Sequence, residues 1–225
     1  MSIQGIIFDF DGLICDTEST ELHAWEKLYV DYGVPFPFEE YQKTIGAVHN
    51  DETPLWLLKE SAGDHFILAE AREKLYEYHK EHNEIEPMRP GVLDYLKDAE
   101  NMGLKIGLAS SSPLSWVGFH LDRLGIKEYF DCIRTFDDVH QTKPDPQLFL
   151  LTLECLSLTA SKTIALEDSI NGVLAAKSAG LITIAVPNAV TRRFTFENAD
   201  LTISSLEEMP LDELIALFEE NNQSK

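Results

Sequence analysis

Short apolar runs rich in β-branched residues alternate with longer helical patterns along most of the chain. The first run, at 3–10, is apolar on both alternating faces, which is typical of a strand buried inside a parallel sheet. Similar runs follow at 104–109, 132–136, 163–166, 182–186 and 201–203. Helical patterns separate and follow these runs, at 91–102, 113–124, 146–156, 169–179 and 206–220. This alternation predicts an α/β fold with a Rossmann-like parallel sheet and right-handed crossovers.

One long segment after the first run carries no strand pattern. Helical patterns are clear in it at 18–32, 53–61 and 66–82. Helices inserted at this point would lie above the carboxyl ends of the strands, where open α/β sheets bind ligands. The sequence therefore predicts an α-helical cap domain over 17–83, inserted into a core formed by 1–16 and 84–225.

The charge of the chain restricts its partners. Asp and Glu number 39 against 18 Lys and Arg, which gives a net charge of −21 with neutral His. We expect no binding to nucleic acid or to an anionic membrane, because both need clustered basic residues. A small anionic substrate stays possible, because a metal ion and a few donors can reverse the field inside a cleft.

The cysteines and the first apolar run bear on the compartment. Cys15, Cys132 and Cys155 cannot all pair within the chain and fit no metal-binding spacing, so we expect reduced thiols. The run at 3–10 reaches carboxylates too early for a signal peptide or a membrane span. We therefore expect a cytoplasmic protein, and a monomer by default.

Two carboxylates stand at the end of the first run, in the sequence Asp9-Phe10-Asp11-Gly12. Alternation along a strand places Asp9 and Asp11 on the same side, where they repel unless a cation or a proton lies between them. Phosphoryl transfer can use such a pair, one as nucleophile and one as proton carrier. Gly12 allows a tight turn beside a ligand. Simple capping by one Asp is the alternative.

Polar residues also follow two later runs. Ser110, Ser111 and Ser112 precede Pro113 at a helix start, where amides and hydroxyls can bind an anion. Capping explains Ser112 as N-cap and Pro113 as the first helical residue, but it does not explain Ser110. Lys143, held before Pro144, could neutralise a phosphate and a carboxylate, or could simply lie exposed in a turn.

The fourth motif is Glu167-Asp168 at the end of the run at 163–166. Adjacent carboxylates there suit a hard cation such as Mg²⁺, although helix capping is again the alternative for one of them. Each motif alone is weak, but all four occur at the ends of predicted strands. Together they indicate a Mg²⁺-dependent site for phosphoryl transfer.

In its motifs the chain resembles the haloacid dehalogenase superfamily, in the β-phosphoglucomutase-like phosphatase branch. The resemblance is carried by IIFDFDGLICDTE, GLASSSP, TKPDP and ALEDSINGVLAAKSAG, in this order and spacing. It covers nearly the whole chain and includes the helical insertion after the first strand, which is similar to the family's cap.

The resemblance implies a role for each motif. Asp9 would be the nucleophile that forms an aspartyl-phosphate, and Asp11 the general acid and base. Ser110 and Lys143 would hold the transferring phosphoryl group. Mg²⁺ would be bound by Asp9, by the backbone carbonyl of Asp11, and by two acidic residues after the fourth run, Asp168 directly and Glu167 directly or through water.

Departures from the family's patterns favour a phosphatase. Dehalogenases lack the second Asp, so Asp11 argues against their chemistry. The resemblance implies that a mutase would carry a cap His where this chain has Glu21, and an Arg where it has His49. No cap Lys can be placed for a phosphonatase. A hexose-phosphate mutase and a catalytically idle binding protein on the same fold remain the alternatives.

The expected substrate is a small phosphorylated metabolite of the sugar phosphate or polyol phosphate class. Besides Gly12 and the serines at 110–112, we expect Thr17, Glu18, His49 and Asn50 to contact it. These cap residues follow the hinge or lie in a cap loop, so they would face the leaving group. The sequence does not identify the substrate further.

Overall fold

The computed structural model describes residues 2–46, 52–83 and 86–221 of the chain. Within these ranges six strands form one sheet in the order β3-β2-β1-β4-β5-β6. Every neighbouring pair is parallel. The strands are β1 (Gly5–Phe8), β2 (Lys105–Ala109), β3 (Cys132–Arg134), β4 (Thr163–Glu167), β5 (Ile182–Ala185) and β6 (Leu201–Thr202). The predicted α/β fold with a parallel sheet is confirmed.

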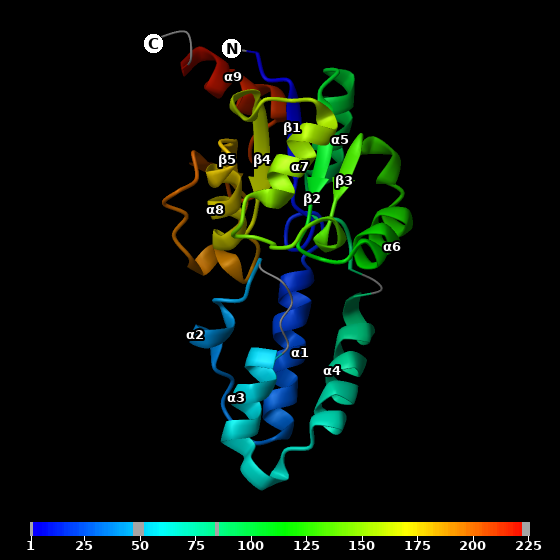
Figure 1. Ribbon diagram of the computed structural model, residues 1–225, viewed down its shortest axis with the longest axis vertical. Coiled ribbons are helices and arrows are strands. Elements are labelled where there is room, and N and C mark those ends of the chain that lie inside the picture. Colours follow the sequence, from blue (N-terminus) through cyan, green and yellow to red (C-terminus); the bar gives the residue numbers. More distant parts are fainter. Residues whose placement is uncertain (1, 47–51, 84–85, 222–225) are drawn as a thin grey trace.

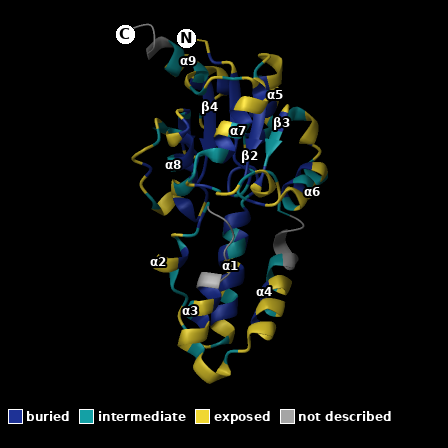
Figure 2. Ribbon diagram, in the orientation of Figure 1, coloured by how far each residue is buried: buried dark blue, intermediate teal, exposed yellow. Residues whose placement is uncertain are grey.

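Helices cover both faces of this sheet (Figure 1). On one face α5 (Val92–Asn101), α6 (Leu114–Leu124) and α9 (Leu211–Asn221) share a buried apolar cluster with Ile6 and Phe8 of β1. On the other, α7 (Gln147–Leu156) and α8 (Ile170–Ser178) pack with Ile7. The central strands, among them β2 and β4 in Figure 2, are therefore buried on both sides, whereas the edge strands β3 and β6 are only partly buried. None of the described helices combines the length and the apolar composition that crossing a membrane requires.

Four helices extend beyond the carboxyl end of the sheet (Figure 1). They are α1 (Thr17–Asp31), α2 (Phe38–Tyr41), α3 (Glu52–Ala62) and α4 (Leu68–Asn83). We call α1–α4 the cap, because they occupy the segment for which the sequence predicts one. Trp25, Leu28 and Tyr29 of α1 are fully buried members of its apolar cluster. The short helix α2 was not predicted, because four residues are too few to show a helical period.

Two element boundaries differ from the prediction for identifiable reasons. The first strand ends at Phe8. Phe10 is buried in the turn that follows, and its backbone carbonyl accepts a hydrogen bond from Ile14 N at 2.9 Å. The last helix begins at Leu211 instead of 206. Before it, the Glu208 carboxylate accepts hydrogen bonds from Ser204 N and Oγ, both at 2.6 Å, which fixes a turn ahead of Pro210.

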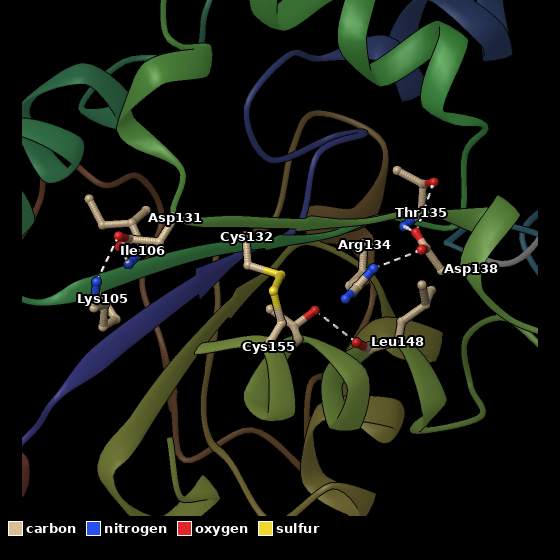
Figure 3. The surroundings of a disulfide bond; sticks show 10 residues. Lys105, Ile106, Asp131, Cys132, Arg134, Thr135, Asp138, Leu148 and Cys155 are labelled. Atoms are coloured by element: carbon tan, nitrogen blue, oxygen red, sulfur yellow. Dashed lines mark hydrogen bonds and ion pairs between the residues drawn. A yellow bond between two sulfur atoms is a disulfide. The ribbon is translucent and has the colours of Figure 1, made fainter. Parts of the chain in front are cut away.

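The cysteine prediction is wrong for two of the three residues. Cys132 and Cys155 form a disulfide between β3 and α7, with their Cα atoms 6.3 Å apart (Figure 3). The edge strand and the helix that covers it bring these residues together, which their separation of 23 positions did not indicate. Cys155 is exposed and Cys132 is buried. Cys15 is a free, buried cysteine.

Candidate active site

The predicted core residues converge at the carboxyl edge of the sheet, next to the cap. Asp9 follows β1 directly, and Ser110 follows β2. Glu167 is the last residue of β4, and Asp168 comes next. Lys143 lies on the loop that leads to α7. All five residues are at most 5% exposed, so they form a buried polar site rather than a solvated surface.

Lys143 is the cation of this site. Its Nζ pairs with Asp9 Oδ1 and lies 2.6 Å from Glu167 Oε1. Burial opposes the charge of the ammonium group, but the two carboxylates raise the pKa of Lys143 above its ordinary value. The side chain therefore stays protonated, and the alternative of an exposed Lys in a turn is wrong.

Three carboxylates lie close enough to share a cation. Ligand oxygens of Asp9, Glu167 and Asp168 all lie within 4.8 Å of one another. Asp168 Oδ1 is buried and has no hydrogen-bond partner among the described residues. Such an orphaned carboxylate oxygen costs free energy unless a ligand satisfies it. The set of hard oxygen donors fits a divalent cation such as Mg²⁺.

The electrostatics of this cluster also favour a bound cation. Burial and the neighbouring charge of Glu167 raise the pKa of Asp9 to about 8, against the opposing effect of Lys143. Burial, Asp9 and Glu18 raise the pKa of Asp168 as well. The positive charges of Lys143 and Arg89 do not balance the three carboxylates of the cluster and Glu18, so the carboxylates must bind either protons or a metal ion.

Asp11 has different surroundings from Asp9. Its Oδ1 accepts hydrogen bonds from Thr17 Oγ1 at 3.0 Å and from Trp116 Nε1 at 2.9 Å. Its Oδ2 accepts from Ser112 Oγ at 2.6 Å and from Ser110 Oγ at 3.3 Å. The Asp11 carboxylate is thus occupied by neutral donors and lies outside the three-carboxylate cluster. That the backbone carbonyl of Asp11 binds the metal ion stays a prediction.

Ser112 and Pro113 do not cap α6 as the sequence predicted. The helix begins one residue later, at Leu114, and Pro113 is the N-cap. Leu114 N donates instead to Asp137 Oδ2 at 2.7 Å. Ser112 is therefore available to Asp11. By contrast, Ser169 is the N-cap of α8, and its Oγ accepts from Gly172 N at 3.0 Å.

The cap touches the core beside this site. Ser111 Oγ donates to Gly46 O at 3.3 Å, and Asn171 Nδ2 donates to Ile45 O at 2.8 Å. Glu18, on α1, is 4% exposed and close enough to Asp168 to influence its pKa. The predicted substrate contacts His49 and Asn50 lie outside the described residues.

Three residues that sequence reasoning did not single out take part in the site. Trp116 binds Asp11 as described, and Asn188 Nδ2 donates to Asp168 Oδ2 at 2.6 Å. The Arg89 guanidinium donates to Gly12 O, and to Pro187 O at 2.9 Å. Only Asn188 had a readable signal, since it lies three residues after β5 and both Pro187 and Asn188 are typical turn residues.

Gly12 is required by the close packing at this point. Its φ is +77°, and a Cβ there would lie 2.1 Å from Asp168 Oδ2. Any other residue would be strained and would displace the carboxylate. The glycine that follows Asp11 therefore allows the first motif to approach the fourth.

Known proteins resemble this chain over most of its length. Over residues 6–186 the chain matches the family described as haloacid dehalogenase-like hydrolase. It is 40% identical over 209 residues to the protein named phosphatase YhcW of Bacillus subtilis (strain 168), covering 93% of this chain and 94% of that protein. It is 32% identical over 180 residues to the phosphorylated carbohydrates phosphatase of Thermotoga maritima, covering 80% and 82%.

A solved structure gives the same result for the fold. A mutant of CbbY from Rhodobacter sphaeroides, in complex with xylulose-(1,5)-bisphosphate, superimposes with a TM-score of 0.75 at 29% identity, covering 94% of this chain and 99% of that one. The relatives named phosphatase support the predicted enzyme class of phosphoric monoester hydrolase. The chain belongs to the haloacid dehalogenase-like hydrolase family.

Proposed function

We propose that the chain is a Mg²⁺-dependent phosphatase that hydrolyses a small phosphorylated metabolite through an aspartyl-phosphate on Asp9. The observation that carries the proposal is the buried cluster of Asp9, Glu167 and Asp168, the first two of which pair with Lys143. A nucleophile, a cation and a set of metal ligands meet there at the open edge of the sheet. Asp11, two residues from the nucleophile, supplies a separate group for proton transfer.

The proposed reaction has two steps. In the first, an Asp9 oxygen bonds to phosphorus while the bond from phosphorus to the leaving oxygen breaks, and Asp11 gives that oxygen its proton. In the second, water attacks the aspartyl-phosphate, Asp11 takes a proton from the water, and inorganic phosphate leaves with Asp9 regenerated. Lys143 and Ser110 hold the phosphoryl oxygens during both steps.

Mg²⁺ is the proposed metal, with Asp9, Glu167, Asp168 and the backbone carbonyl of Asp11 as its protein ligands. When bound, it supplies positive charge that offsets the charge developing on the phosphoryl oxygens. Lys143 alone cannot do this, because two carboxylates already neutralise it. The orphaned Asp168 Oδ1 supports direct binding by Asp168.

The substrate class that we propose is a sugar or polyol phosphate. Support comes from the phosphatase relative that acts on phosphorylated carbohydrates and from the CbbY complex with a sugar bisphosphate. A hexose-phosphate mutase is the second candidate. It is less favoured because Glu21, at the position expected for a mutase His, accepts a hydrogen bond from Trp25 Nε1 within α1 at 3.3 Å.

The cap is proposed as a domain of its own over 17–83, hinged on the core formed by 1–16 and 84–225. The segment that leads from the core into α1 pairs with the segment that returns from α4 to the core. Cys15 forms an isolated β-bridge with Met88, and Arg89 N donates to Ile14 O at 2.7 Å. A monomer in the cytoplasm is the proposed state. The Cys132–Cys155 disulfide stands against that compartment, because disulfides are rare in a reducing cytosol.

Phosphate release from a panel of sugar and polyol phosphates tests the proposal. We expect release in the presence of Mg²⁺, loss of release with a chelator, and recovery when Mg²⁺ is restored. Conversion of β-glucose-1-phosphate without phosphate release would indicate the mutase instead. No turnover of any panel member or of p-nitrophenyl phosphate would indicate an idle binding protein.

A further inference from the structure

The side-chain amide of Asn188, on the connection from β5 to β6, is fixed in one orientation. Its Oδ1 accepts hydrogen bonds from the backbone N–H groups of Val190 at 2.8 Å and Thr191 at 2.9 Å. Backbone N–H groups only donate, so the oxygen must face them. The NH₂ group therefore faces Asp168, where it donates to Oδ2 at 2.6 Å.

This hydrogen bond makes the two oxygens of Asp168 different. Oδ2 accepts from Asn188, whereas Oδ1 is buried and has no partner among the described side chains and backbone groups. Gly12 packs against the same side, since a Cβ there would lie 2.1 Å from Oδ2 and 2.6 Å from Asn188 Nδ2. The carboxylate is therefore held with one defined oxygen left for a cation.

The turn that carries Asn188 is itself held firmly. Thr191 Oγ1 accepts from Asn188 N at 3.0 Å, and Arg89 donates to Pro187 O at 2.9 Å. Val190, at the centre of the turn, is 2% exposed within the apolar cluster of the cap. The amide is thus positioned by its own turn in the core, by Arg89 on the segment that returns from the cap to the core, and by the apolar cluster of the cap.

We propose that Asn188 is a positioning residue for Asp168, which presents Oδ1 as a monodentate ligand and so favours Mg²⁺ over larger cations. This inference rests on the proposed function, because it takes Asp168 as a metal ligand. Mg²⁺ demands a strict octahedral arrangement, whereas Ca²⁺ accepts longer bonds and bidentate carboxylates. A carboxylate that is free to turn offers both oxygens and loses this discrimination.

The test measures Mg²⁺ and Ca²⁺ binding to the metal-free full chain by titration calorimetry, without any substrate. The main variant is Asn188→Ser, whose hydroxyl can still accept from the turn but is too short to reach Asp168. Asn188→Ala removes both interactions. Thr195→Val is the matched control, because it changes an exposed residue of the same connection and leaves the turn and the amide on Asp168 in place.

For Asn188→Ser and Asn188→Ala we expect the Kd for Mg²⁺ to rise about 10–100-fold, the usual effect of losing an outer partner of a metal ligand. The Kd for Ca²⁺ should change much less, by about threefold or under, because Ca²⁺ tolerates a turned carboxylate. Thr195→Val should keep the wild-type Kd for each ion.

An equal rise in the Kd values for Mg²⁺ and Ca²⁺ in the Asn188 variants would overturn the inference, since it would indicate a general structural loss. Wild-type Mg²⁺ binding in Asn188→Ser would overturn it as well. In both cases the proposed metal site would stand. Wild-type protein that binds neither ion would overturn the metal site and the role of Asn188 together.

Discussion

Asp9 and Asp11 lie two positions apart and have opposite surroundings. Asp9 is buried against a lysine and two carboxylates, whereas Asp11 is half-buried and accepts hydrogen bonds from three hydroxyl groups and an indole. A nucleophile must be held close to the metal ligands and the cation. A proton carrier must reach the leaving group instead. The separation of the two environments fits a division of these tasks.

Asp11→Asn should lower kcat on a sugar phosphate by about 10²–10⁴-fold, the usual contribution of general acid–base catalysis. KM should change little, because the proposed phosphate contacts are Ser110 and Lys143. The exposed Asp64→Asn, the same chemical change at the far end of the cap, should leave both constants unchanged. Steady-state kinetics of these variants on one sugar phosphate provides the measurement. A near wild-type kcat for Asp11→Asn would show that Asp11 does not transfer the proton.

The pKa of Asp9 predicts a pH-dependent loss of stability without metal. Burial raises this pKa from 3.8 to about 8 in the folded protein. The contribution of Asp9 to stability is therefore full below its unfolded pKa and is lost as the pH rises through 8. In chelator, the Tm of wild type relative to Asp9→Asn should fall from about pH 5 to about pH 8.

Mg²⁺ should reverse this decline, because it binds the ionised carboxylates and displaces their protons. The Mg²⁺-induced rise in wild-type Tm should therefore be larger at about pH 8 than at about pH 5. Thermal melts of both proteins over this range provide the measurement. A Tm difference in chelator that does not vary with pH would mean that Asp9 is ionised without a metal.

Sequence reasoning found the residues that follow strands and missed those that reach the site from elsewhere. Asp9 and Asp168 were predicted because a polar residue at the end of an apolar run needs an explanation, and Lys143 because Pro144 holds it just before a helix start. Trp116 was missed because a tryptophan within a helical pattern is ordinary core. Asn188 looked like a turn residue, and only the folded chain shows that its amide reaches Asp168.

At the scale of elements, the disulfide joins an edge strand to the helix that covers it. It closes a loop with a sequence separation of 23, and this loop contains Lys143. A cross-link of this length contributes about 3 kcal/mol to the free energy of unfolding. In a chain of this size, reduction should therefore lower Tm by about 6–12 °C.

Melts with and without a reductant test this prediction, with Cys155→Ser as the control that has no disulfide to lose. Its Tm should match that of reduced wild type and should not respond to reductant. A thiol assay on denatured, unreduced protein should find Cys15 alone. Three reactive thiols, with no effect of reductant on Tm, would restore the original expectation of reduced cysteines.

The cap should determine which substrates are used and contribute less to the phosphoryl step. Replacing His49 and Asn50 with Ala should change the ratios of kcat/KM across a panel of sugar phosphates. Hydrolysis of p-nitrophenyl phosphate should change little, because its small leaving group does not need the cap. His65→Ala, in the exposed turn before α4, is the control. Uniform losses on every substrate would place His49 and Asn50 in the shared chemistry.

At the scale of the whole molecule, the fold class was readable because fully buried parallel strands leave continuous apolar runs between helical patterns. The Cys132–Cys155 pairing was not readable, since it depends on how α7 crosses β3. Substrate identity was not readable either. The core motifs handle the phosphoryl group that all substrates share, and the cap residues that distinguish substrates form no recognisable pattern.

The central claim is that Asp9 carries the phosphoryl group during turnover. The most direct measurement is acid quenching of the enzyme with Mg²⁺ and a sugar phosphate, followed by mass spectrometry of its peptides. The account predicts a labile phosphate on the peptide that contains Asp9, greater occupancy in Asp11→Asn if the second step is slowed more than the first, and no phosphate in Asp9→Asn. Phosphate on a different residue, or wild-type turnover by Asp9→Asn, would contradict the account.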